Sequence, residues 1–273
     1  MEFGISTFVT DQGIRPDVLG AALEERGFDS LFLAEHSHIP VSRESPYPGG
    51  GELPEKYKRT LDPFIALTAA AGATSKLLLG TGIALLIQRD LIHTAKEVAS
   101  LDLVSRGRVP FGVGVGWNRE EMRNHGTDPA TRGELIDEQL AALKEIWTSE
   151  EAEFHGKHVD FDPMFSWPKP GRVPVYVGGQ SPAALRRVAR FGDGWLLLAN
   201  TRFDEVRRVR SWLAGQGRTD VSFDVFGGRS EPEMIQGYAA AGVDRYTFML
   251  ETLPEAETLR ELDALAQVAA AHR

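Results

Sequence analysis

Cysteine is absent from the 273 residues of this chain. Its absence excludes disulfide bonds, thiolate nucleophiles, iron–sulfur clusters and zinc sites built from cysteine. Basic residues are also scarce, because 30 lysines and arginines face 39 acidic residues and leave a formal net charge of −9. Proteins that bind nucleic acid usually present a basic face, so we expect no such partner. An anionic ligand would have to be held locally, by backbone N–H groups or a few arginines.

Long hydrophobic runs are missing too. No apolar run approaches the roughly 20 residues that span a bilayer. The first residues, MEFGISTFVTDQG, lack the basic region of a signal peptide. With 42% hydrophobic and 25% charged residues, the composition is ordinary for a globular protein. We therefore predict a soluble, cytoplasmic protein with no membrane partner.

Short β-like runs alternate with longer helix-like stretches along the whole chain. Each of eight predicted strands is followed by a helix, and the strands cover residues 3–9, 28–35, 76–86, the start of 108–121, 173–179, 193–199, 220–228 and 244–250. This alternation predicts a parallel α/β structure, a (β/α)₈ TIM barrel forming a single domain over residues 1–273. The rival is a doubly wound open sheet, which usually has five or six such units.

Two segments depart from the alternation. A long loop rich in proline and glycine, residues 36–60, follows the second strand. An insertion after the fourth helix, residues 150–172, has a period-two pattern around His155-Gly156 that predicts a small hairpin. The loop from Ser37 to Thr60 is a candidate lid, because structureless loops of this length are usually functional.

In such a barrel, function lies at the carboxyl ends of the strands. The residues expected there are Thr7, Glu35, His36, Thr81, Gly82, Ile83, Gly114, Gly116, Trp117, Asn118, Gly178, Gly179, Gln180, Ser181 and Trp195. The two tryptophans could pack on a flat ligand ring or could close the core. The alternating glycines of GVGVG, residues 112–116, indicate either clearance for a ligand or relief of crowding.

The stretch VGGQSPAALRR, residues 177–187, joins a strand to a helix. Ser181 is placed as the N-cap and Pro182 as the first helical residue. Free N–H groups and the positive end of the helix dipole suit a phosphate at this junction. The alternative is a well-capped helix without a ligand.

The stretch LAEHSHIP places Glu35, His36 and His38 at the end of the second strand. His36 is a candidate acid or base, since imidazole titrates near neutrality. A metal site with His38 and Glu35 is an alternative, but Glu35 points opposite to His36 in a strand, and no second ligand cluster stands out. We predict no metal. A plain surface-loop histidine is the third interpretation.

Several motifs together resemble the luciferase-like monooxygenase superfamily, and most of all its coenzyme F420-dependent oxidoreductase branch. They are, in chain order, AKEVASLDLVSRGRV, GVGVGWNREEM, NHGTDPATRG, EFHGKHVDFD and VYVGGQSPAALRRVARFGDGWL. The resemblance spans Phe3 to Leu250. It implies a barrel whose mouth holds F420, or alternatively FMN, and a small organic molecule as substrate. Dimerisation is implied by the family alone.

Residue by residue, the resemblance implies that residues 178–181 contact the cofactor phosphate, with residues 116–118 nearby. It also implies a non-prolyl cis peptide, best matched by Gly82-Ile83. His36 matches the family histidine, but Trp117 stands where the sugar-phosphate dehydrogenases of the superfamily keep a glutamate. The proton-transfer pair is therefore expected to be incomplete. Pro110-Phe111 replaces the leucine usual before the glycine strand, and this proline fits only a strand start or edge.

The sequence thus predicts an F420-dependent oxidoreductase that transfers a hydride at the barrel mouth. An FMN-dependent luciferase-like monooxygenase is the first alternative. A non-catalytic protein that binds F420 or flavin is the second, and a metal-dependent hydrolase using His36 and His38 is the third.

Overall fold

A computed structural model describes all residues, 1–273. Eight parallel strands form one sheet in the order β3-β2-β1-β10-β9-β8-β7-β4. Their bounds are β1 Glu2–Thr7, β2 Ser30–Leu33, β3 Leu78–Thr81, β4 Phe111–Val113, β7 Val175–Gly178, β8 Gly194–Leu198, β9 Ser222–Gly228 and β10 Arg245–Leu250. The first and last strands of this order, β3 and β4, meet through a parallel bridge between Ala84 and Val113. The sheet is therefore a nearly closed barrel, and the open-sheet alternative is wrong.

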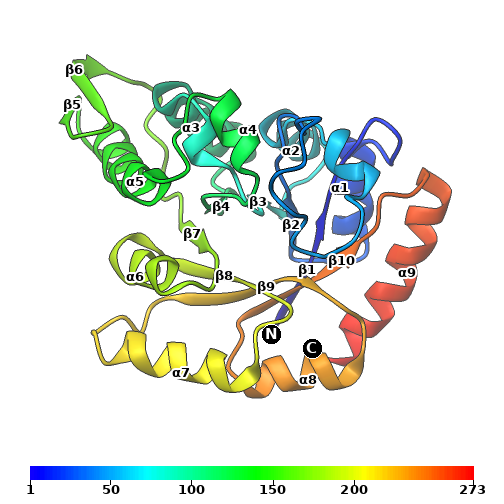
Figure 1. The fold of residues 1–273 in the computed structure, drawn as a ribbon. Helices are drawn as coiled ribbons and strands as arrows, with labels where there is room; N and C mark the ends of the chain where they lie inside the picture. The colour runs from blue at the N-terminus through cyan, green and yellow to red at the C-terminus, as the bar shows by residue number, and fades with distance from the viewer.

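Helices surround the strands (Figure 1). They are α1 Pro16–Glu25, α2 Pro63–Gly72, α3 Leu91–Ser105, α4 Arg119–Asn124, α5 Arg132–Thr148, α6 Pro182–Phe191, α7 Phe203–Ala214, α8 Pro232–Ala240 and α9 Glu255–Ala271. The expected strand–helix alternation is confirmed, and the short α4 is additional. No helix has both the length and the apolar character needed to cross a membrane.

Side-chain caps fix where several helices begin. Asp62 accepts a hydrogen bond from the N–H of Ile65 at the start of α2, and Asp90 accepts one from His93 at the start of α3. Each cap satisfies an N–H group that has no partner within its helix. At the other end, α3 stops where Arg106 and Gly107 take left-handed φ angles of 63° and 81°. These local features set where α2 and α3 begin and where α3 ends.

The core has two layers. Outward-facing side chains of the strands, such as Trp195 and Leu197 on β8, pack in a large apolar cluster with the surrounding helices. Inside the barrel, Phe32, Tyr176 and Leu196 form a second cluster, against which Ile83 and Phe226 pack. The inner cluster fills the barrel below its mouth, so any ligand must bind above it.

The insertion forms an antiparallel hairpin of β5 Glu151–His155 and β6 Asp160–Phe165, as the sequence predicts. It projects from the barrel beside α5 (Figure 1). The loop after β2 contains a short 3₁₀ helix, η1 Glu55–Lys58, and a second one, η2 Leu86–Gln88, follows β3. Pro110 directly precedes β4, which is the strand-start position expected of a proline.

Candidate active site

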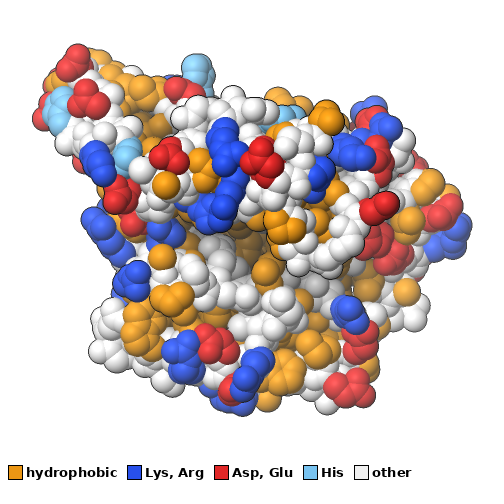
Figure 2. Space-filling view, viewed as in Figure 1, with side chains coloured by type: hydrophobic (Ala, Val, Ile, Leu, Met, Phe, Trp, Pro, Cys, Tyr) orange, Lys and Arg blue, Asp and Glu red, His pale blue; other side chains and the backbone are white.

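A cavity of about 720 Å³ lies at the carboxyl ends of β8, β9 and β10. Its walls include Leu198, Phe226, Arg229 and Met249. Figure 2 shows a central hollow between the two groups of helices, with hydrophobic side chains at its floor. The volume lies within the range of cofactor and ligand pockets. We refer below to this cavity at the ends of β8, β9 and β10 as the mouth cavity.

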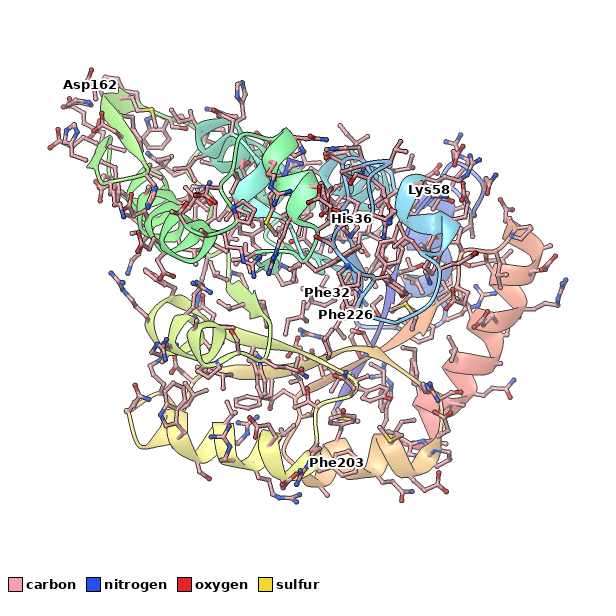
Figure 3. The ribbon with its side chains drawn as sticks, in the orientation of Figure 1. Phe32, His36, Lys58, Asp162, Phe203 and Phe226 are labelled. Carbon is pink, nitrogen blue, oxygen red and sulfur yellow. The ribbon has the colours of Figure 1, made fainter.

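The floor of the mouth is built around a glycine. Gly82 and Ile83 are joined by a cis peptide bond, as expected from the family resemblance. A Cβ atom added to Gly82 would overlap the ring of Phe226 and lie 3.1 Å from Cβ of Phe32. Figure 3 shows Phe32 and Phe226 close together at the centre of the molecule. Glycine thus lets two aromatic side chains close the barrel beneath the mouth.

The alternating glycines of β4 make room for the protein itself. A Cβ on Gly112 would overlap the carbonyl oxygen of Thr81 on β3, and a Cβ on Gly114 would overlap Cδ1 of Ile83. Gly178 on β7 is similar, since its Cβ would lie 2.9 Å from Cγ2 of Ile83. Relief of crowding therefore accounts for all three glycines: Gly112 makes room for the backbone of Thr81, and Gly114 and Gly178 make room for the side chain of Ile83.

His36, which follows β2, and Glu121 on α4 form a buried imidazole–carboxylate pair. Nδ1 of His36 is 2.8 Å from Oε2 of Glu121, and the backbone N–H of Ser37 donates to Oε1 of the same carboxylate at 3.2 Å. His36 is 8% exposed and Glu121 is not exposed at all. Burial weakens competition from water, so the two side chains are held in a fixed mutual orientation, unlike a loose surface contact.

The position of Glu121 follows from the local sequence. Asn118 is the N-cap of α4, and its side chain accepts a hydrogen bond from the N–H of Glu121 at 3.2 Å. Glu121 is therefore the third helical residue, the acidic position of a capping box. Here its carboxylate turns toward His36. The expectation that Trp117 leaves His36 without a carboxylate partner is wrong, because the partner comes from one turn further along the chain.

The motif Asn-Arg-Glu-Glu, residues 118–121, is the sequence signal that could have located Glu121. An N-cap asparagine followed three residues later by glutamate marks a helix start at the mouth. Asn118 itself, 2% exposed, has its side-chain oxygen occupied by the cap. It positions Glu121 and is not free to bind a cofactor through that oxygen.

Aromatic rings from the loop after β2 and from the segment between β4 and α4 cover His36. The ring centroid of Tyr57 lies 5.1 Å from that of His36, and Trp117 lies 5.9 Å from it. Tyr47 packs edge-on against both Tyr57 and Trp117. Burial, together with a hydrogen bond to Tyr47, raises the pKa of Tyr57 above its usual range. These rings keep water from one side of the His36–Glu121 pair.

The same loop is fastened to α4. Ser45 donates through both its N–H and its hydroxyl group to Glu120, which neighbours Glu121. Burial acts to raise the pKa of Glu120, but the hydrogen bonds from Ser45 outweigh it and the pKa is lowered. Two consecutive glutamates of α4 thus hold the loop at two points, Ser45 and the His36-Ser37 segment.

The carboxylate of Glu35, two residues past the end of β2, has other partners than His36. It accepts hydrogen bonds from the N–H of Leu85 at 2.6 Å and from Nε of Arg89 at 3.0 Å. Burial raises the pKa of Glu35 to about 7 despite Arg89. His38 instead contacts Ser37 and Asn124 at the surface. No group of three or more potential metal ligands is present.

The junction between β7 and α6 has the geometry of an anion site. Gly179 has a φ of 110°, and no backbone carbonyl accepts the N–H groups of Gly179, Gln180 or Ser181. The Ser181 side chain accepts the N–H of Ala184, which leaves its hydroxyl hydrogen free to donate. The Gln180 side chain contacts Asn200, a residue that lines the mouth cavity. The N-terminus of α6 is thereby joined to the mouth.

Three of the expected mouth residues serve the barrel wall instead. Trp195 is 0% exposed, packs on Phe223 and donates through Nε1 to the carbonyl of Gly179 at 2.8 Å. It supports the β7–α6 turn from behind, and the expectation that it stacks on a ligand is wrong. The hydroxyl groups of Thr7 and Thr81 are both buried and donate to the carbonyls of Leu250 and Gly112.

The remaining two expected residues, Gly116 and Trp117, lie between β4 and α4. Gly116 has a φ of 64° and begins the turn into α4. Trp117 is half-buried, with Arg43 5.8 Å above its ring. The structure therefore groups His36 with Glu121, Tyr57 and Trp117, and it joins the α6 N-terminus to the mouth cavity through Gln180 and Asn200. Compared with the residues expected from the sequence, the site lacks Trp195 and gains Glu121 and Tyr57.

These features define a class: a (β/α)₈ barrel with a cavity at the carboxyl ends of its strands and a buried His–Glu pair that joins the end of β2 to α4. Residues 18–229 match the luciferase-like monooxygenase family, and the chain belongs to that family. An uncharacterised protein of Mycobacterium tuberculosis strain H37Rv is 37% identical over 260 residues, which cover 91% of both chains.

Two other similar proteins have names that state a cofactor. The F420-dependent hydroxymycolic acid dehydrogenase of Mycobacterium tuberculosis is 24% identical over 255 residues, 90% of this chain and 67% of that protein. The solved structure of an F420-dependent secondary alcohol dehydrogenase in complex with an F420–acetone adduct covers 100% of both chains with a TM-score of 0.77 and 19% identity. That level of identity shows a shared fold.

Proposed function

We propose that this protein is an F420-dependent oxidoreductase that moves a hydride between the deazaflavin and an alcohol or carbonyl group of a small organic substrate. The buried His36–Glu121 pair is the observation that carries the proposal. Oxidation of an alcohol releases a proton as well as a hydride, so it needs a base beside the reacting oxygen. The relatives named above as F420-dependent dehydrogenases support the choice of cofactor.

The residues present fit such a cofactor. The free N–H groups of Gly179, Gln180 and Ser181, at the positive end of the α6 dipole, would hold its phosphate. The apolar floor made by Ile83 and Phe226 would support its flat ring. When bound, the deazaflavin supplies the carbon that accepts or releases the hydride.

The protein's own part is proton transfer and exclusion of water. An ionised Glu121 can only accept hydrogen bonds, so it holds the proton of neutral His36 on Nδ1. Nε2 is then left as an acceptor, able to take the proton of a substrate hydroxyl. Tyr57 and Trp117 cover the imidazole and fix its plane. The reverse reaction, reduction of a carbonyl, would use protonated His36 as the acid.

Titration of the purified, cofactor-free protein with F420 and with FMN, followed by fluorescence, tests the cofactor. We expect F420 to bind at least tenfold more tightly. Ser181→Asp keeps an N-cap acceptor for α6 but adds a negative charge, so it should abolish binding. The control Ser211→Asp adds the same charge on exposed α7 and should leave binding unchanged.

Tight binding of FMN without F420 would instead support the FMN-dependent monooxygenase. Tight F420 binding without turnover over a panel of alcohols and ketones would support the non-catalytic binding protein. Unchanged affinity in Ser181→Asp, with α6 intact by circular dichroism, would show that the phosphate does not bind at this helix.

A further inference from the structure

A second cavity, of about 410 Å³, lies between α5 and α6, which are neighbours beside β7 in Figure 1. The residues just before β7 and β8 line it, and so does Val175, the first residue of β7. It therefore lies at the amino ends of these strands, whereas the mouth cavity lies at the carboxyl ends. We call it the α5–α6 cavity. Its volume lies within the range of small-molecule pockets.

Part of the cavity wall is apolar and aromatic. Trp147 on α5 is half-buried, and its Nε1 already donates to the carbonyl of Ala95 at 3.1 Å. Its indole therefore offers the cavity only apolar surface. Phe191, the last residue of α6, is also half-buried and lines the same space. Two aromatic rings that keep part of their surface open suit a flat apolar molecule, which would bury that surface.

The charged part of the wall is positive. Its one carboxylate, Asp193, faces four cations, which are Lys144, Arg172, Arg190 and Arg218. The chain as a whole carries a net charge of −9, so its average composition does not account for this excess of positive charge. A cavity lined by one sign of charge raises the local concentration of the opposite sign. The α5–α6 cavity thus favours anions.

Two of the four cations have partners in the fold. Arg218 donates to the carbonyls of Ala189 and Gly192 at 2.7 Å and 2.6 Å, and so holds the end of α6. Arg172 lies 3.5 Å from Asp193, whose other oxygen accepts the N–H that begins β7. These contacts explain both arginines without a ligand.

The other two cations, Lys144 and Arg190, have no such explanation. Neither side chain forms an ion pair or a hydrogen bond with the protein, and both are exposed. The guanidinium carbon of Arg190 lies 4.6 Å from the ring centroid of Phe191. Contact with the ring restricts the guanidinium but uses none of its N–H groups, which can bind a carboxylate through two parallel hydrogen bonds.

We propose that the α5–α6 cavity binds an aromatic carboxylate, a small molecule with a flat apolar body and one anionic group. The rings of Trp147 and Phe191 would cover the body, and Arg190 would pair with the carboxylate. Lys144 would add to the attraction. Active sites of (β/α)₈ enzymes lie at the carboxyl ends of the strands, so this ligand is bound here and not converted. The site shares no residue with the mouth cavity, and it does not rest on the proposed function.

Four probes separate the contribution of charge from that of the apolar body. The compounds 2-naphthoate, 2-naphthylmethanol and 2-naphthylmethylamine carry an anionic, a neutral or a cationic group on one ring system, and acetate carries the anion alone. In calorimetric titrations of the purified protein we expect naphthoate to bind most tightly, with the amine and acetate at least tenfold weaker. Absence of naphthoate binding, or an amine or acetate that binds equally well, would overturn the proposal.

Two variants separate a ligand site from a structural role of the cations. Arg190→Gln and Lys144→Gln should each weaken naphthoate binding roughly tenfold and leave naphthylmethanol unchanged, since each removes one positive charge. Arg260→Gln removes the same charge from exposed α9, away from the cavity, and is the matched control that should change neither probe. A purely structural Arg190, as a cation at the C-terminal end of α6, would lower the thermal midpoint and leave naphthoate binding intact. That result would contradict the assignment.

A further variant distinguishes this cavity from the junction proposed to hold the cofactor phosphate, which could also attract an anion. Ser181→Asp adds a negative charge at the other end of α6, and it should leave naphthoate binding unchanged. If Ser181→Asp abolishes naphthoate binding while Arg190→Gln preserves it, the anion binds at the N-terminus of α6 and the proposal falls. The titrations need no cofactor, so failure of F420 binding leaves this proposal standing, and failure of naphthoate binding leaves the redox proposal standing.

Discussion

Glu121 joins the chemistry of the site to its architecture. Its two oxygens accept from the His36 ring and from the N–H of Ser37, so one buried side chain fixes both the imidazole and the start of the loop. Its neighbour Glu120 holds Ser45 in the same loop but does not contact His36. The two adjacent glutamates therefore allow the proton-transfer role proposed for Glu121 to be tested against the purely positional role of Glu120.

Glu121→Gln should lower kcat on the order of a hundredfold, because a neutral amide no longer stabilises a protonated His36 during proton transfer. The affinity for F420 should stay unchanged, since Glu121 is not among the residues proposed to hold it. The measurement is the pH dependence of kcat for F420 reduction. Glu120→Gln is the control, and it should keep the shape of the wild-type profile. Identical profiles for both variants would show that Glu121 has only a structural role.

Single residues mark the limit of what the sequence predicts. The capping role of Ser181 and the cis bond at Gly82-Ile83 are confirmed. Trp195 was misplaced because the strand pattern does not state which face of β8 lies inside the barrel. The sequence does not point to Glu121 because the family glutamate corresponds to the position of Trp117. The carboxylate comes instead from a residue about one helical turn further along the chain, where a side chain lies on the same side again.

At the scale of elements, a single side chain joins α1 to the start of β3. Glu24 on α1 accepts hydrogen bonds from the N–H groups of Ser75, Lys76 and Leu77. Its burial acts to raise the pKa, but these hydrogen bonds outweigh it and hold the pKa at about 2. Since the folded pKa lies below the ordinary value of 4.5, Glu24 contributes stability that is fully present above pH 4.5.

That contribution should disappear as the pH falls from about 4.5 to about 2, when Glu24 becomes protonated in the folded state. Urea denaturation at a series of pH values, from neutral down to the acid limit of folding, measures it. The variant Glu24→Gln should be less stable than the wild type at neutral pH, and the difference should shrink below pH 4.5. The exposed Glu150→Gln is the control. A difference that is constant with pH would contradict the assignment.

Elements were the easiest level to predict. Caps at Asp62, Asp90 and Ser181 define helix starts by local hydrogen bonds, which sequence patterns report directly. The 151–165 hairpin was predicted for the same reason, through its local alternation. The path of the loop after β2 was not, because its contacts with Glu120 and Glu121 join residues more than 70 positions apart.

At the scale of the whole molecule, the barrel is closed unevenly. The first and last strands in sequence, β1 and β10, are paired over six residues, from Glu2 with Arg245 to Thr7 with Leu250. Between β3 and β4 the pairing is reduced to the Ala84–Val113 bridge. The glycines of β4 allow close approach there but contribute no side-chain packing of their own. The β3–β4 seam is thus the weakest junction of the ring, and it borders the mouth.

Hydrogen–deuterium exchange should therefore be faster at the amides of Ala84 and Gly114 than at the amides of β1, by roughly tenfold or more. These two amides donate across the seam, to Gly112 and Ala84, and opening there breaks few other contacts. A ligand that binds only the closed mouth shifts the equilibrium away from the open form. Saturating F420 should accordingly slow exchange at the seam and leave that of β1 unchanged. Equal protection at both junctions without ligand would show that the barrel opens only as a whole.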